Sequence, residues 1–466
     1  STVPKKNLVL EPFFSYPSSQ VNIPEEGNRM FSSRRVSPPP MPVSIPPAFI
    51  EGVLEQVKSF LEPYFPLFHR TDMAFTAWLY LQGLLSNLPR KSAEPIAELH
   101  DLDRKVLQRF VGVSPWDDRR VRDKMVEDVS RELGDPTGVL CADPSGFPKK
   151  GTKSVGVKRQ WCGRTGKKDN CQVGVFGSYA SPKGRCLVDT QLFLPREWCD
   201  DKERRAECHV PEDRTHQKHW ELALEVLSNI SKIPHACILA DSELGRCGEF
   251  RDSLAQRGEH YIVDIPVSLN IRVMAKRTPL APVNAKTWLK SRGKSEWIRV
   301  KTREGSQGDR IFEACRAEVL TERKDGTFRR ETILAIRPVK TPKDVRLALA
   351  LMPTGTSLEE MVQYGTRRWT IEDCLERAKS ECGMGQYEVR SWIGWHHHMT
   401  MAMLAIWLLE KLRISKTGGA GPASSFPPSD VPTFCTHAGR AHFQPRGRPD
   451  PAGQKNFQAS ESTAPR

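Results

Sequence analysis

The sequence has no Cys-x-x-Cys pair and no long apolar run, and these two absences narrow the class of protein. Its twelve cysteines are scattered from Cys141 to Cys435, without the close spacing that zinc sites and disulfide scaffolds need. We therefore expect reduced thiols that are mostly buried. The longest apolar stretch, Met399 to Leu412, is interrupted by Glu410 and Lys411, so it predicts a buried helix and not a membrane span.

The opening residues STVPKKNLVL lack the charged start, apolar core and small-residue cleavage site of a secretory signal. We expect a cytoplasmic protein with no membrane partner. Seventy lysines and arginines against 56 acidic residues give a formal net charge of +14. Such an excess is typical of proteins that bind a polyanion, but a solvated basic surface explains the total charge equally well.

The first part of the chain divides into a tail and a helical domain. Residues 1–46 contain SYPSSQ and VSPPPMPVSIPP, which predict a disordered proline-rich tail. Over 47–135, apolar residues recur at three- and four-residue spacing, as in FIEGVLEQVKSFLEPYF. This periodicity predicts an N-terminal helical domain.

The rest of the chain predicts an α/β protein. Over 136–266, strand-like segments such as VLCAD and RCLVDTQLFLP precede alternating helices and strands, which describes a mixed sheet. More strand-like runs predict an inserted β subdomain over 267–354, and helical periodicity returns over 355–414. The composition of 415–466 predicts a second disordered tail.

Two aspartates end strand-like segments. Asp143 ends VLCAD and Asp241 ends ACILAD. Taken alone, Asp143 is better explained as an aspartate that begins a turn before Pro144. Together the two would lie at the ends of neighbouring strands, where α/β proteins place their ligands. Carboxylates at such a position suit a hard cation such as Mg²⁺.

Glu372 is the candidate for a third acid. A helix is predicted around it, with Ile371, Leu375 and Ala378 on the apolar face and Glu372 on the polar face. Without the two aspartates, an ordinary i,i+4 charge ladder with Glu376 would be the better explanation. With them, three carboxylates would offset the charge of two metals about 3.5–4 Å apart, which activate the attacking oxygen and neutralise the leaving one in phosphodiester chemistry.

A family resemblance rests on DPSGFPKKGTKSVGVKRQWCG, GKKDNCQVGVFGSYAS, LADSELG and YGTRRWTIEDCLERAKSECGMGQYEVRSW. These segments resemble the DDE transposases of bacterial insertion sequences, most of all insertion-sequence family seven-oh-one, a relative of family four. The resemblance extends from about Leu61 to Arg413. It implies a ribonuclease H-like core with a β insertion ahead of the third acid, and a DNA-binding role for the helical domain over 47–135.

The resemblance also implies a site and its partners. Asp143, Asp241 and Glu372 would be the catalytic residues and the ligands of two Mg²⁺ or Mn²⁺ ions. Arg368 and Lys379 keep the family's spacing around the third acid and would contact phosphates, whereas the first tyrosine of that signature is not matched. The expected partners are double-stranded transposon ends and target DNA, bound by a homodimer at the bacterial nucleoid.

A basic stretch follows the first acid and predicts a track for the DNA backbone. Its candidate DNA-binding residues are Lys149, Lys150, Lys153, Lys158 and Arg159. A solvated hairpin is an equally good interpretation. Trp369 could stack on an extruded base, although a tryptophan buried in a helix is the simpler expectation.

Two other features, a histidine triplet and a further aspartate, resemble functional sites but are better explained by structural roles. The triplet His396, His397 and His398 cannot bind one ion from a helix, because consecutive side chains point in different directions. We expect at most one of these rings to face DNA or the core. Asp189 is a rival acid in the middle of its segment, and we predict a structural role for it.

The sequence therefore predicts an active DNA transposase that cuts element ends and joins them to a target. Two alternatives stay open at this point. One is a DNA-binding protein of transposase descent that no longer cuts, which the presence of all three acids disfavours. The other is a nuclease of the same fold that hydrolyses DNA without joining it.

Overall fold

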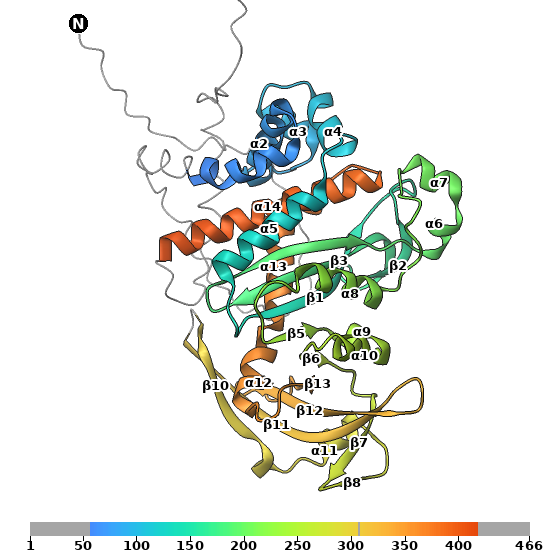
Figure 1. Cartoon of the computed structure of the whole chain (residues 1–466), viewed down its shortest axis with the longest axis vertical. Coiled ribbons are helices and arrows are strands. Elements are labelled where there is room, and N and C mark those ends of the chain that lie inside the picture. Colours follow the sequence, from blue (N-terminus) through green and yellow to red (C-terminus); the bar gives the residue numbers. More distant parts are fainter. Residues whose placement is uncertain (1–55, 306–307, 418–466) are drawn as a thin grey trace, which may run out of the picture. The chain divides into compact units, whose positions relative to one another are not determined.

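The computed structural model describes residues 56–305 and 308–417 (Figure 1). The two tails predicted over 1–46 and 415–466 lie outside these residues, apart from 415–417, which continue the last helix. None of the helices in the described residues is long and apolar enough to cross a membrane.

The first described segment is helical. Its elements are η1 (Glu62–Phe68), α2 (Thr71–Leu85), α3 (Ala93–Leu99), α4 (Arg104–Gly112) and α5 (Asp118–Leu133). Asp103 and Asp117 begin α4 and α5, because their carboxylates accept hydrogen bonds from backbone N–H groups of the first turn. The apolar faces of these helices are buried in one core, which they share with the long helix α14 (Trp392–Thr417).

Next comes a run of strands followed by alternating helices and strands. The strands are β1 (Val139–Pro148), β2 (Lys158–Cys162), β3 (Lys167–Ser181), β4 (Gly184–Leu192), β5 (Cys237–Ala240) and β6 (Tyr261–Asp264). The helices are α6 (Arg196–Asp200), α7 (Lys202–Glu207), α8 (His219–Ile230), α9 (Ser242–Gly245) and α10 (Gly248–Gln256). The strands are ordered β4-β3-β1-β5-β6, with β3 antiparallel to β1 and β4, and with β5 parallel to β1 and β6. This is the mixed sheet that the sequence predicted.

The strand-like residues after 266 extend the same sheet. Their elements are β7 (Asn270–Ala275), β8 (Thr278–Pro279), β9 (Val283–Asn284), α11 (Ala285–Lys290), η2 (Lys294–Glu296), β10 (Ile298–Gly305), β11 (Gly308–Glu322), β12 (Phe328–Pro338) and β13 (Arg346–Leu351). Strand β13 pairs antiparallel with β6, and β12 and β11 follow it outward. The domain boundaries drawn from the sequence stay predictions.

A buried carboxylate joins these later strands to the earlier ones. Glu331 on β12 has a fully buried side chain, which accepts hydrogen bonds from Arg251 of α10 (3.1 Å) and Tyr261 of β6 (2.6 Å). Thr321 of β11 is a third donor to the same carboxylate. Because a buried charge must be paired and hydrogen-bonded to be tolerated, this network fixes where β11 and β12 lie against α10.

The chain then returns to helices, as predicted. These are α12 (Leu358–Gly365), η3 (Thr366–Arg368), α13 (Trp369–Ser380) and α14. Ser357 and Glu360 form a capping box that begins α12. The apolar face expected for α13 is buried, with Ile371, Leu375 and Ala378 in the core. The described cysteines are all free thiols and mostly buried, which confirms that expectation.

All three histidines of the triplet are buried, so the expectation that at most one would face the core was wrong. His397 lies between the carbonyl oxygens of Val111 (3.0 Å) and Trp116 (2.9 Å), and its ring stacks on that of Trp116. His398 lies 2.8 Å from the Tyr80 hydroxyl. The helical domain packs over this start of α14 and supplies partners to His397 and His398, whereas His396 hydrogen-bonds to the Trp392 carbonyl of α14 itself.

Burial of His398 makes stability depend on pH. Burial lowers the pKa of this ring to about 4, whereas an unfolded histidine titrates near 6.5. The unfolded chain therefore binds more protons below pH 6.5, so stability is lost as the pH falls from 6.5 toward 4. For this ring we expect a loss of about 2 kcal/mol between pH 7 and pH 5, measured by urea unfolding at both values.

A neutral replacement isolates that contribution. His398→Gln cannot take up the proton and should lose about 2 kcal/mol less than the parent chain between the two pH values. His209→Gln is the control, because this histidine is exposed. An unchanged pH dependence in His398→Gln would show that another group causes the loss.

Candidate active site

Asp143 and Asp241 lie side by side in the sheet. The parallel pairing of β1 with β5 ends at Ala142 and Ala240. Asp143 is the next residue of β1, and Asp241 is the residue directly after β5. The sequence had placed Asp143 at the end of a strand, and this was wrong. Strand β1 continues to Pro148 because the long strand β3 pairs with it over that whole length. Asp143 therefore lies mid-strand, at the point where β5 leaves the sheet.

The carboxyl group of Asp143 is in an unfavourable place for a negative charge. Its pKa is raised to about 8, mainly by burial and then by repulsion from Asp241, with smaller repulsions from Glu372 and Glu243. The positive charge of Arg368 opposes the rise. Asp143 is therefore influenced by three other carboxylates and by the neighbouring cation Arg368.

Asp241 is held by the helix that follows it. Its carboxylate accepts hydrogen bonds from the backbone N–H groups of Glu243 (3.1 Å) and Leu244 (3.0 Å), so it is the N-cap of α9. Burial raises the pKa of Asp241, while the hydrogen bond from Leu244 opposes the rise. The cap fixes the side chain on the side of the sheet where Asp143 lies.

Glu372 reaches the same neighbourhood from α13, but it has a partner of its own. Its side chain is 56% exposed and forms an ion pair with Arg368, at 2.7 Å. Arg368 also pairs with Asp264 at the end of β6, at 2.8 Å. Within the described residues, no three histidine, cysteine or acidic side chains stand close enough to hold a metal ion. The two aspartates are thus neighbours, whereas Glu372 is paired with Arg368.

The donor set nonetheless fits a hard divalent cation. Carboxylate oxygens are the ligands that Mg²⁺ and Mn²⁺ prefer. Each aspartate has a raised pKa with burial as the largest cause, and a cation between them would stabilise both charges. The acids predicted as ligands therefore suit the predicted metals in their chemistry.

Lys379 lies against β1, next to the aspartates. Its ammonium group is 2.7 Å from the Ser145 hydroxyl and 4.7 Å from the centre of the Phe147 ring. Its pKa is lowered to about 8, mainly by burial and then by the positive charge of Arg164. The sequence predicted a phosphate contact for Lys379, and in the structure this lysine reaches from α13 to Ser145, two residues beyond Asp143 on β1.

Some basic side chains of the stretch after β1 pack inside the protein and others are exposed. Lys149 turns inward: its ammonium donates to the Tyr387 carbonyl (3.1 Å) and lies 3.3 Å from that ring's centre. Burial lowers the pKa of Lys149 to about 7. Lys150 is exposed just after β1, and Arg159 is exposed on β2.

The other two lysines of the stretch have acidic partners from a later segment. Lys153 is 3.6 Å from Glu207 of α7, and Lys158 pairs with Glu197 of α6. The segment itself holds no acidic residue before Asp169, so its sequence could not show that α6 and α7 neutralise part of its charge.

Trp369 is more exposed than expected. The ring is 38% exposed at the start of α13, so the expectation of a buried tryptophan was wrong. The guanidinium carbons of Arg185 and Arg310 lie 4.9 Å and 5.4 Å from its ring centre. Two cations on an aromatic ring beside Glu372 are an arrangement suited to phosphate and base contacts.

Asp189 takes no part in this site. Its side chain is fully buried and pairs with Arg122 and with Arg119, the latter at 3.1 Å. The amide of Asn229 donates to it at 2.8 Å. The structural role predicted for Asp189 is confirmed.

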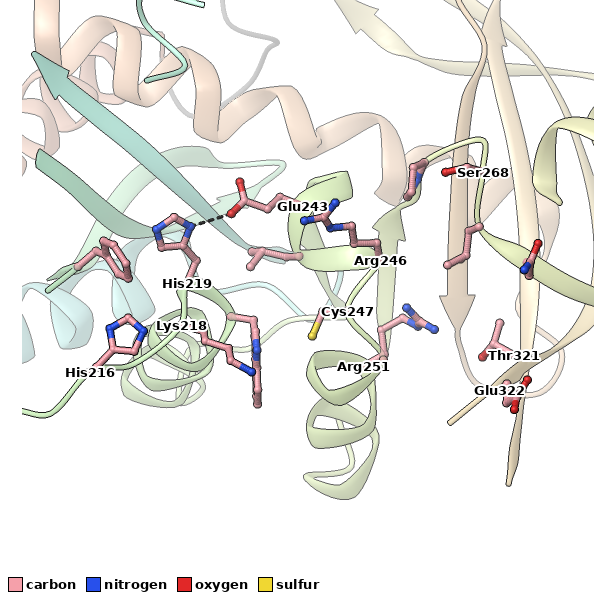
Figure 2. Close-up of a pocket in the computed structure, with 17 residues that line it drawn as sticks. His216, Lys218, His219, Glu243, Arg246, Cys247, Arg251, Ser268, Thr321 and Glu322 are labelled. Atoms are coloured by element: carbon pink, nitrogen blue, oxygen red, sulfur yellow. Dashed lines mark hydrogen bonds and ion pairs between the residues drawn. The ribbon is translucent and has the colours of Figure 1, made fainter. Parts of the chain in front are cut away.

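Sequence reasoning missed an open groove beside the aspartates (Figure 2). Glu243, two residues after Asp241, lines it and hydrogen-bonds to His219 of α8 at 2.7 Å. The close-up shows this pair on one side of the groove and Arg246 on the same short connection. The residues come from segments far apart in the chain, and no spacing in the sequence links them.

Comparison with known proteins identifies a family that matches the part of the chain containing both aspartates. The model of a family described as DDE superfamily endonuclease matches residues 63–302, a little more than half of the chain. This range includes Asp143 and Asp241 and ends before Glu372. Over 209 residues the chain is 29% identical to a protein of Microchaete diplosiphon described as a probable transposase for insertion sequence element IS701. The match covers 44% of this chain and 52% of that protein, about half its length.

A solved structure was also found, the NurA nuclease from Sulfolobus solfataricus. It is 9% identical, covers 52% of this chain and 79% of its own, and has a TM-score of 0.23. That score is too low to indicate a shared fold.

Proposed function

The chain belongs to the DDE superfamily of endonucleases, and from that premise we propose that it is the DNA transposase of an insertion sequence. It would cleave phosphodiester bonds at element ends and join the ends to target DNA. The observation that carries this proposal is the pair Asp143 and Asp241, adjacent on parallel strands with Arg368 and Lys379 beside them. The similarity to a probable IS701 transposase supports joining as well as cutting.

Membership of this superfamily implies catalysis with divalent metals. Asp143 and Asp241 would hold two Mg²⁺ or Mn²⁺ ions, which supply activation of the attacking oxygen and neutralisation of the leaving oxygen. Glu372 would complete the ligand set. Its present partner Arg368 is the cation best placed to pair with a phosphate of the bound strand. Lys379 would contact the strand from the β1 side.

We extend the proposal to the fold of the core, which would be ribonuclease H-like. Support comes from the order β4-β3-β1-β5-β6, with three antiparallel strands followed by two that run parallel to β1. That order puts the two aspartates on adjacent strands at its centre. The helical segment η1 to α5 would then carry part of the DNA contact, and paired element ends would call for a homodimer.

A cleavage and joining assay tests the proposed function. Labelled duplexes carrying the borders of the element are incubated with the protein, Mg²⁺ and a supercoiled target plasmid. Insertions into the plasmid are the expected result. Nicks without insertions would instead indicate a nuclease of this superfamily, and a shifted band without nicks would indicate a binding protein that no longer cuts.

Substitutions of Lys149 and Lys150 distinguish a lysine that packs inside the protein from one that contacts DNA. Because Lys150 is exposed, Lys150→Ala should weaken binding to all DNA sequences alike and reduce the salt slope by about one unit. Lys149→Ala should instead lower stability, because it removes a ring and carbonyl contact inside the protein. Fluorescence anisotropy with mixed-sequence duplexes and thermal melting give the two readouts. Equal loss of DNA affinity in both variants, without loss of stability, would contradict this division.

A further inference from the structure

The proposed function assigns no role to the groove beside the aspartates, although its location and its lining residues suggest one. We name it the α8–α10 groove, because residues at the starts of α8, α9 and α10 form one side of it and residues 266–270 with β11 form the other. Its volume is about 890 Å³. That is near the upper end for pockets that hold one small ligand, so it has room for a few nucleotides and none for a duplex.

The side nearest the aspartates is basic and aromatic. Lys218 and Arg246 are both exposed at the groove. Trp220 also lines it, and the centre of its ring lies 5.9 Å from the Lys218 ammonium. Cations that follow a phosphate backbone and an aromatic face on which a base can stack are the two components of sites for single-stranded nucleic acid.

Two helices also begin at the groove, and each carries a glutamate in its first turn. They are α8 and α10, with Lys218 and Cys247 as their N-caps. Unpaired N–H groups and the dipole of a helix favour anions at this end. Arg251 also lines the groove but is committed to Glu331 and to the Gly245 carbonyl, so it holds the α9–α10 connection in place.

The acidic residue on this side is already paired. Glu243 hydrogen-bonds to His219 across the groove wall. Glu243 lies on the short helix α9 that Asp241 caps, so this side of the groove is two residues away from the nearer aspartate in the chain. A strand whose phosphate lies at Asp143 and Asp241 would therefore have a short path into the groove.

We propose that the α8–α10 groove holds unpaired nucleotides of the DNA strand next to the bond that is cut, with a base on Trp220 and phosphates at Lys218 and Arg246. This inference rests on the proposed function and goes beyond it, because it assigns single-stranded DNA a site of its own. It also makes a local opening of the duplex part of recognition.

Two DNA probes test the groove without requiring the element's own sequence. One is a fluorescein-labelled mixed-sequence duplex with blunt ends, and the other is the same duplex with a short oligothymidylate overhang. Binding is measured by anisotropy with Ca²⁺ in place of Mg²⁺. The full chain should bind the overhang duplex about tenfold more tightly than the blunt one, the gain that one stacked base supplies.

The variants locate that preference. Arg246→Ala and Trp220→Ala should each reduce the affinity for the overhang duplex severalfold and leave blunt binding unchanged. Trp220→Phe keeps an aromatic face and should retain most of the preference, which separates stacking from misfolding. Arg277→Ala is the matched control, because Arg277 is exposed at the β7–β8 turn, outside the groove residues.

The results that would overturn the inference differ from those that would overturn the proposed function. The groove proposal would be contradicted if the parent chain bound both probes with equal affinity. It would also be contradicted if Arg246→Ala and Trp220→Ala weakened binding of both probes equally. In either case the proposed DNA binding would still stand. Failure of the parent chain to bind either probe removes the proposed function and the groove together.

Discussion

Asp143→Asn is expected to abolish metal-dependent DNA cleavage, by a factor on the order of 10³ or more, while DNA binding persists or tightens. Asparagine nearly preserves the shape of the side chain but removes a charged ligand for the metals. Binding should not fall, because one repulsion with the phosphate backbone is gone. The measurement is cleavage of a labelled end duplex in Mg²⁺ and in Mn²⁺, beside anisotropy of the same duplex in Ca²⁺.

The melting temperature of the same variant tests whether Asp143 is a metal ligand or has only a structural role. Because burial and Asp241 raise the pKa of Asp143 to about 8, its ionisation opposes folding as the pH rises above its unfolded value. Asp143→Asn removes that cost, so the melting temperature without metal should stay the same or rise. The increase in melting temperature that Mg²⁺ gives the parent chain should disappear.

A pair of glutamates on one helix supplies the control. Glu372→Gln should lose cleavage as Asp143→Asn does, whereas Glu376→Gln, also exposed and one turn further along α13, should cleave normally. Loss of cleavage only in Glu376→Gln would show that the third acid was assigned to the wrong residue. Full cleavage by Asp143→Asn would remove the active site proposed here.

Asp189→Ala is expected to give the largest loss of stability, about 3–5 kcal/mol, because it removes the fully buried one of the two carboxylates that pair with the buried Arg122 cation. Arg122 is 3% exposed and forms ion pairs with Asp189 and Asp118. Removal of Asp189 also leaves the Asn229 amide without its acceptor. Urea unfolding at pH 7 measures the loss.

Asp123→Ala is the matched control for that experiment. Asp123 pairs with Arg119, which Asp189 also contacts, but the Asp123 side chain is 53% exposed. Exposed ion pairs contribute about 0–1 kcal/mol, so its loss should be small. Comparable losses in the two variants would mean that burial of Arg122 is not the cause.

The sequence by itself determined the order and type of the elements and the chemical class of the site. Strands and helices could be predicted because their apolar periodicity is local, as at Ile371, Leu375 and Ala378 on α13. Asp241 could be placed at a strand end because ACILAD is a short buried run that stops at a polar residue. Family membership could be predicted because the motifs around the acids are themselves contiguous segments.

The tertiary structure alone decided which charges meet. Asp143 lies mid-strand because β3 pairs with β1 beyond the end of β5. Glu372 forms an ion pair with Arg368, which also pairs with Asp264. Lys149 turns inward because Tyr387, 238 residues later, supplies a ring and a carbonyl. Side-chain partners of this kind are set by packing between distant segments, whereas hydrophobic periodicity is set within a few residues. For that reason the groove between α8, α10 and β11 had no signature in the sequence.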